Sequence, residues 1–330
     1  NPLFVALYIS FFPQLVAGPI VRYSTIEQQI ASRVCTVEKF WEGMQRFILG
    51  FCKKIILANN LYMVVEEAFK NPQSYSSANP AFLWLGSICF TLQIYYDFSG
   101  YSDMAIGLGK MFGFEFEENF NYPYISRSVT EFWRRWHMSL GQWFRDYVYF
   151  PMGGSRVSVP RHIFNLFVVW ALTGFWHGAN FTFIVWGLLY FVLLVVEKFL
   201  IKPMERKNKV FLVFWFIVTI FSVNLGWVLF NSNNITDAMN YIVGMFGGFG
   251  TPFAIDDHLI RYVREYGVFI VAGILFSTPV VKKLRSVIEK KEWASNTAVI
   301  VSPICYAFGF LWSVSYLVLG AHNPFIYFNF

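Results

Sequence analysis

Long apolar runs separated by short polar and basic segments dominate the pattern along this chain. A helix of about 20 apolar residues crosses a bilayer core, and runs of this kind predict eight membrane spans. The predicted spans are residues 1–20, 44–65, 81–107, 163–177, 181–198, 210–230, 266–281 and 297–320. The third run is long enough to predict a broken helix. The run from 163 to 200 predicts a helical hairpin that turns at the sequence HGAN. We therefore expect an all-α polytopic membrane protein.

Composition and charge placement agree with this class. Of 330 residues, 56% are hydrophobic and 14% are charged, which lies outside the range of soluble proteins. Lys and Arg collect in cytoplasmic loops, and placing residues 21–43 inside puts most of the basic residues on that side. This topology makes 108–162 a cytoplasmic-side region and places His177 and the C-terminus outside. The net charge of +6 then reflects the loop bias and needs no nucleic-acid partner.

The start of the chain and the spacing of the cysteines indicate how the domain is organised. The sequence opens NPLFVALYIS, inside an apolar stretch and without methionine or a basic leader. We read residues 1–330 as a single membrane-embedded domain that lacks its N-terminal part. The four cysteines lie far apart, so they predict neither a disulfide framework nor a C-x-x-C metal site.

The region 108–162 is too long for a turn and too aromatic for a solvated loop. Ser128 and Glu131 have the spacing of a capping box, which predicts a helix start. That helix would carry one apolar, largely aromatic face. The predicted face consists of Phe132, Trp133, Trp136, His137, Leu140, Trp143, Phe144 and Tyr147. The pattern predicts an interfacial or re-entrant helix that presents His137 to the apolar side.

Ionisable side chains within apolar runs are the candidate chemistry. His177 is a candidate because such groups at membrane depth are rare and usually functional. A single histidine on an apolar helix face, such as His137, is more often a hydrogen-bonded structural residue than a catalyst. Asp97 and Asp103 suit a proton relay or an ion site, but they suit capping of a broken helix nearly as well.

Four strings resemble the membrane-bound O-acyltransferase (MBOAT) family, in its bacterial branch of alginate O-acetylation, peptidoglycan O-acetylation and teichoic acid D-alanylation proteins. These strings are QLVAGPIVRY, YYDFSGYSDMAIGLGKMFGF, NFNYPYISRSVTEFWRRWHMSLGQWFRDYVYFPMGGSR and LTGFWHGANFTFIVWG. The resemblance implies a multi-helix bundle with a central tunnel, His177 as the principal catalytic residue and His137 as the second motif histidine. It also implies a thioester donor, either acyl-CoA or an acyl carrier protein, that enters from the cytoplasm.

The residue chemistry fits acyl transfer independently of that resemblance. Transfer from a thioester to a hydroxyl needs a base and support for an oxyanion, and a neutral imidazole supplies the base without a permanent buried charge. Trp176 and Asn180 are candidates to orient the ring or to bind the oxyanion. A cationic rim suits an anionic donor, although the positive-inside bias alone explains most of it. The rim residues singled out here are Arg134, Arg135 and Arg145.

These patterns predict an O-acyltransferase of the bacterial cytoplasmic (inner) membrane, with no bound cofactor and no metal site. Its partners would be the donor inside, and outside a polysaccharide or cell-wall polymer with a secreted or membrane-anchored acyltransferase. The terminal sequence NPFIYFNF resembles a motif of the same acyltransferase group in which a tyrosine relays the acyl group, and the corresponding residue here is Tyr327. The alternative is that these aromatic residues form a belt at the membrane interface. A transporter or flippase without acyl-transfer chemistry is the competing class, but no repeat symmetry supports it.

Overall fold

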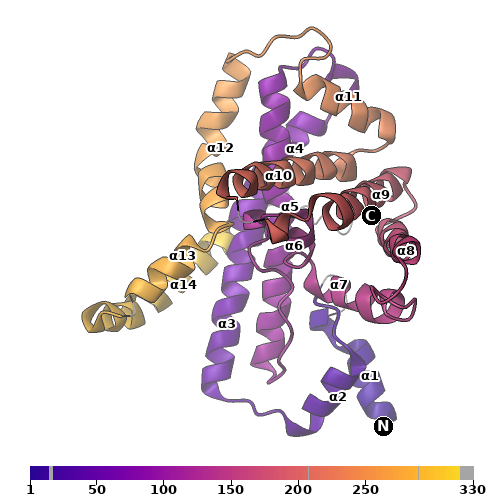
Figure 1. The fold of residues 1–330 in the computed structure, drawn as a ribbon. Coiled ribbons are helices and arrows are strands. Elements are labelled where there is room, and N and C mark those ends of the chain that lie inside the picture. The colour runs from indigo at the N-terminus through magenta and orange to yellow at the C-terminus, as the bar shows by residue number, and fades with distance from the viewer. Residues whose placement is uncertain (15–17, 207, 289, 320–330) are drawn as a thin grey trace. The chain divides into compact units, whose positions relative to one another are not determined.

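The computed structural model describes residues 1–14, 18–206, 208–288 and 290–319, and every regular element in those ranges is a helix. The all-α class is therefore confirmed (Figure 1). The α-helices are α1 (Pro2–Ser10), α2 (Tyr23–Ser32), α3 (Val37–Cys52), α4 (Asn59–Phe69), α5 (Pro80–Met111), α6 (Val129–Trp133), α7 (Met138–Phe144), α8 (Val159–Trp176), α9 (Phe181–Val195), α10 (Lys209–Asn231), α11 (Ile235–Met245), α12 (Asp257–Phe276), α13 (Val280–Ile288) and α14 (Glu292–Val318).

Two compact units make up the chain. Among the described residues, one contains Asn1–Asn60, Gln93–Asn121 and the residues from Ala272 to Leu319, and the other contains Leu61–Leu92 and Tyr122–Val271. Both histidines singled out from the sequence belong to the second unit.

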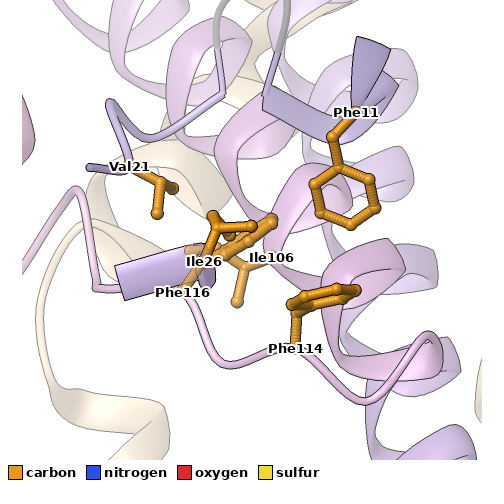
Figure 2. Close-up of a cluster of buried hydrophobic side chains, with 6 residues drawn as sticks. All are labelled: Phe11, Val21, Ile26, Ile106, Phe114 and Phe116. Carbon is orange, nitrogen blue, oxygen red and sulfur yellow. The ribbon is translucent and has the colours of Figure 1, made fainter. Parts of the chain in front are cut away.

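Within the first unit, α3 packs closely on α5 through glycines. A Cβ atom at Gly43 would lie 2.6 Å from the carbonyl oxygen of Gly107, so only glycine permits this approach. The π-helical turn η2 (Lys53–Ala58), which follows α3, adds a buried ion pair with α5, because Lys54 Nζ lies 2.6 Å from the Asp97 carboxylate. A small apolar core fastens the N-terminal helices to the end of α5 (Figure 2). Its members are Phe11, Val21, Ile26, Ile106, Phe114 and Phe116.

Within the second unit, α8 and α9 form the predicted helical hairpin, and α10 packs beside α9 (Figure 1). The two helices of the hairpin pack closely because Gly174 faces the backbone of Phe183. A Cβ atom at Gly174 would lie 2.5 Å from the carbonyl oxygen of Phe183. Gly187 approaches the carbonyl of Trp170 in the same way. The turn between the helices needs Gly178, whose φ of 146° lies where side chains are rarely tolerated.

The helix lengths correct part of the predicted membrane pattern. The span predicted at 1–20 is wrong as a single helix, since α1 ends at Ser10 and its 9 residues reach only about 14 Å. The third predicted span is not broken, because α5 continues through all 32 residues from Pro80 to Met111.

Several helices of the described residues could cross a bilayer. Four are long and apolar enough: Val37–Phe69, Phe181–Ile201, Lys209–Asn231 and Val299–Val318. The pair α12 and α13, bent by 63°, would make a fifth. The chain thus has the helices of a polytopic membrane protein.

Candidate active site

The segment that carries His137 begins as the sequence predicts. Ser128 caps α6, and its hydroxyl oxygen accepts a hydrogen bond from the backbone N–H of Glu131 at 3.0 Å. The Glu131 carboxylate turns back to the N–H of Arg127 at 2.9 Å and also binds Arg135 at 2.8 Å. Burial raises the pKa of Glu131, but these partners lower it more, so the pKa lies below its ordinary value.

The predicted helix does not continue through His137. It ends at Trp133, and α7 begins only at Met138, so the single aromatic face expected over 132–147 is wrong. His137 adopts a left-handed conformation with φ 44°, which is uncommon for a residue other than glycine. Periodicity could not reveal this break, since the sequence there contains neither glycine nor proline. The bend buries the His137 side chain, which is 5% exposed.

A carboxylate that sequence analysis did not single out anchors α6. Glu197 lies in the π-helical turn η6 (Val196–Ile201), and it is 2% exposed. It accepts hydrogen bonds from the N–H groups of Val129 at 2.7 Å and Thr130 at 2.8 Å. It also accepts from the Thr130 hydroxyl at 2.8 Å and the Trp215 indole at 2.9 Å. An acidic residue inside an apolar run was the available signal.

His177 follows α8 at the hairpin turn, and its ring lies among aromatic rings. The ring centroids of Trp176, Trp186 and Phe230 lie 4.9, 5.1 and 5.1 Å from that of His177. Trp176 also contacts His137, with 6.0 Å between the ring centroids. The candidate Trp176 is therefore placed beside both histidines.

A cavity of about 250 Å³ has both His137 and His177 on its wall. The charge bias placed His137 in a cytoplasmic-side region and His177 outside, and it gave no reason to expect both side chains on one cavity wall. The break before α7 lets the segment fold against the end of α8 instead of running as one interfacial helix. Trp133 is also on this wall. Its buried indole N–H finds no acceptor within the part of the chain that the structure describes.

The predicted donor-mouth arginines separate into two groups. Arg134 and Arg145 lie on the cavity wall, whereas Arg135 is engaged with Glu131 and does not line the cavity. Arg145 also pairs with Asp146 at 2.9 Å.

The remaining candidates are not among the residues on the wall of this cavity, or they lie outside the described residues. Asn180 caps α9 by accepting from the N–H of Thr182 at 3.1 Å and donates to the carbonyl of Asn233 at 2.7 Å. Both ends of its amide are thus engaged in the hairpin turn. Asp97 belongs to the first unit, and Tyr327 lies outside the described residues. Among described residues, no three His, Cys, Asp or Glu side chains gather as a metal site would require.

Apolar helices and a cavity that has His137 and His177 on its wall define a helical membrane protein with two histidines in one pocket. The chain belongs to the MBOAT, membrane-bound O-acyltransferase, family, whose model matches residues 1–243. It is 44% identical to the probable alginate O-acetylase of Pseudomonas aeruginosa over 76% of this chain and 47% of that protein.

Two further relatives widen the comparison. The chain is 31% identical to the peptidoglycan O-acetyltransferase of Helicobacter pylori over 98% of this chain and 64% of that protein. It is 29% identical to the teichoic acid D-alanyltransferase of Bacillus subtilis over 70% of this chain and 62% of that protein. The chain spans about half the length of the alginate relatives it matches.

Proposed function

We propose that this chain carries the catalytic site of a membrane O-acyltransferase, which moves an acyl group, acetyl in the first instance, from a thioester donor to a hydroxyl. The observation that carries the proposal is the pair His137 and His177 on the wall of one cavity. Family membership supports it, since the relatives are named for O-acetyl or D-alanyl transfer.

His177 acts as the general base. An imidazole has an ordinary pKa near 6.5 and accepts a proton near neutral pH without a permanent charge. The acceptor oxygen attacks the thioester carbonyl carbon while its proton passes to the His177 ring. The new C–O bond forms, the C–S bond breaks, and the proton on His177 passes to the departing thiolate, so the imidazole is neutral again.

Two other groups support this step. The indole N–H of Trp133 is a buried donor on the cavity wall, so it suits the carbonyl oxygen as negative charge develops there. His137 is held on the same wall by its left-handed backbone, and we assign it to the orientation of the reacting groups. The aromatic rings around His177 limit water, which protects the thioester from hydrolysis.

The wider reaction extends the proposal to both sides of the membrane. Acyl-CoA or an acyl carrier protein delivers the thioester from the cytoplasm of a bacterial cell, and the protein lies in the cytoplasmic membrane. Tyr327 takes the acyl group and offers it to a secreted or membrane-anchored acyltransferase, which places it on a polysaccharide or cell-wall polymer. The named activities of the relatives support this acceptor class.

Thioester turnover tests the proposal. The full-length protein in liposomes should release CoA from radiolabelled acetyl-CoA, or free carrier from the acetylated carrier protein, when an acceptor is present. His177→Ala should slow release by at least about 100-fold, as expected for loss of a general base. The matched control is His258→Ala, because the His258 side chain is 39% exposed, packs on the rings of Phe82 and Tyr262, and does not line the cavity.

The outcomes separate the two candidate classes. Retention of more than about a tenth of the wild-type rate by His177→Ala would refute its role as the base. A wild-type protein that moves intact donor across the membrane without releasing thiol would be a transporter.

A further inference from the structure

Beside the cavity, two polar side chains converge on one nitrogen of His162. The Tyr149 hydroxyl oxygen lies 2.7 Å from His162 Nε2, and Lys198 Nζ lies 3.0 Å from the same atom. His162, in the first turn of α8, is only 5% exposed. Nothing in acid–base transfer at His177 uses this group, which we call the His162 cluster: Tyr149, His162 and Lys198.

Hydrogen-bond counting leaves the His162 cluster with spare donors. An ammonium group only donates, so Nε2 must offer its lone pair to Lys198, and it has only one. The Tyr149 hydroxyl then cannot donate to that lone pair. The Tyr149 proton and two Lys198 protons are therefore available to a further acceptor.

Arg134 and Lys198 are exposed cations, and the positive charge of Arg134 opposes that of Lys198. Neighbouring arginines have carboxylate partners, as Arg145 has Asp146 at 2.9 Å and Arg135 has Glu131 at 2.8 Å. No carboxylate of the described residues pairs with Arg134 or Lys198 within 4.0 Å. An anion between them would relieve the repulsion.

The His162 cluster borders the cavity of the two histidines. Tyr149 and Arg134 lie on the cavity wall. So do Leu166 and Leu194, each four residues from a member of the cluster and thus one helical turn away. The cavity of about 250 Å³ is smaller than the about 300–1,000 Å³ of sites that enclose a whole ligand. Only the slim end of a large donor can enter it.

We propose that Arg134, Lys198 and Tyr149 bind the phosphate of the donor's phosphopantetheine arm, which leaves the thioester end inside the cavity. This inference rests on the proposed function. Acyl-CoA and an acyl carrier protein share this arm and its phosphate, so the site serves either source. A cation pair with a hydroxyl donor matches the charge and the acceptor oxygens of such a phosphate.

Steady-state kinetics in liposomes test the site with three donors: acetyl-CoA, the acetylated carrier protein and acetyl-pantetheine, which lacks the phosphate. Lys198→Gln should raise KM for the phosphate-bearing donor at least roughly tenfold, since hydrogen bonds between charged groups are lost. The kcat and the KM for acetyl-pantetheine should not change. Lys198→Arg keeps the charge and should restore most of the affinity.

Lys202→Gln is the matched control, because Lys202 lies four residues further on and faces Glu205 at 3.9 Å. Its KM should equal that of the wild type. Equal KM values for Lys198→Gln and wild type, or an equal rise with acetyl-pantetheine, would overturn the phosphate site. If Lys198→Gln changes the KM for acetyl-CoA or for the acetylated carrier protein, that donor is the source of the phosphopantetheine arm.

Two further experiments test the remaining explanations for an effect of Lys198→Gln. Liposomes of phosphatidylcholine alone are compared with liposomes that contain phosphatidylglycerol; an effect of Lys198→Gln seen only with the anionic lipid would assign the cluster to a lipid headgroup and contradict the proposal. Binding of phosphopantetheine and of pantetheine is also measured by calorimetry, without turnover. Phosphate-dependent binding that Lys198→Gln weakens supports the site even if no donor turns over. Absence of that binding refutes the site even if turnover occurs.

Discussion

Glu197→Ala should lower the stability of the protein, because the Glu197 carboxylate anchors the start of α6. The buried carboxylate accepts four hydrogen bonds, two of them from the backbone N–H groups of Val129 and Thr130. The Thr130 hydroxyl and the Trp215 indole can turn toward other acceptors, but the backbone groups are fixed. Each buried donor without an acceptor costs about 1–3 kcal/mol, so two predict a loss of about 2–6 kcal/mol.

Thermal unfolding of the detergent-purified protein, followed by tryptophan fluorescence, measures this loss. Unfolding entropy is about 2.1 cal/mol/K per residue, so in a chain of 330 residues one kcal/mol lowers the midpoint by about 1.4 °C. Glu197→Ala should therefore lower it by at least about 3 °C. Glu205→Ala is the control, because its side chain is 73% exposed and lies 3.9 Å from Lys202. Equal midpoints for the two variants would refute the assignment of Glu197 as an anchor.

Two other predictions concern the hairpin and the C-terminus. Gly187→Ala should destabilise the α8–α9 hairpin by about 1–3 kcal/mol, because its Cβ would press on the carbonyl of Trp170. Gly267→Ala has its nearest atom 3.9 Å away and should leave the unfolding midpoint unchanged; similar midpoints for both variants would argue against close helix packing. Tyr327→Phe should stop polymer acylation in cells while the protein accumulates normally, and mass spectrometry should find an acyl adduct on wild-type Tyr327. Wild-type acylation by Tyr327→Phe would leave the tyrosine as a membrane anchor.

The sequence predicted the elements governed by local rules. Ser128 and Glu131 marked the start of α6, and the polar residues after His177 marked the hairpin turn, because caps and interruptions of apolar runs are local signals. The break at His137 was missed, since a left-handed residue other than glycine is imposed by surrounding structure and not by its own preference. That break is what brings His137 to the cavity of His177.

Contacts distant in sequence could not be predicted in the same way. Glu197 meets Val129 across 68 positions, and Lys198 meets His162 across 36. Hydropathy treats such charged residues as span ends and says nothing of their partners. For α5 the opposite error occurred, because its length suggested a break that the helix does not have.

The central claim is that the donor thioester reaches the cavity between His137 and His177. A thioether analogue of acetyl-pantetheine with a photoreactive acetyl end should label peptides that contain Leu140, Gly141 or Thr173, which all line that cavity. Excess acetyl-CoA or acetylated carrier protein should suppress the labelling. Labelling confined to peptides outside 130–194, or labelling that neither donor suppresses, would contradict the account.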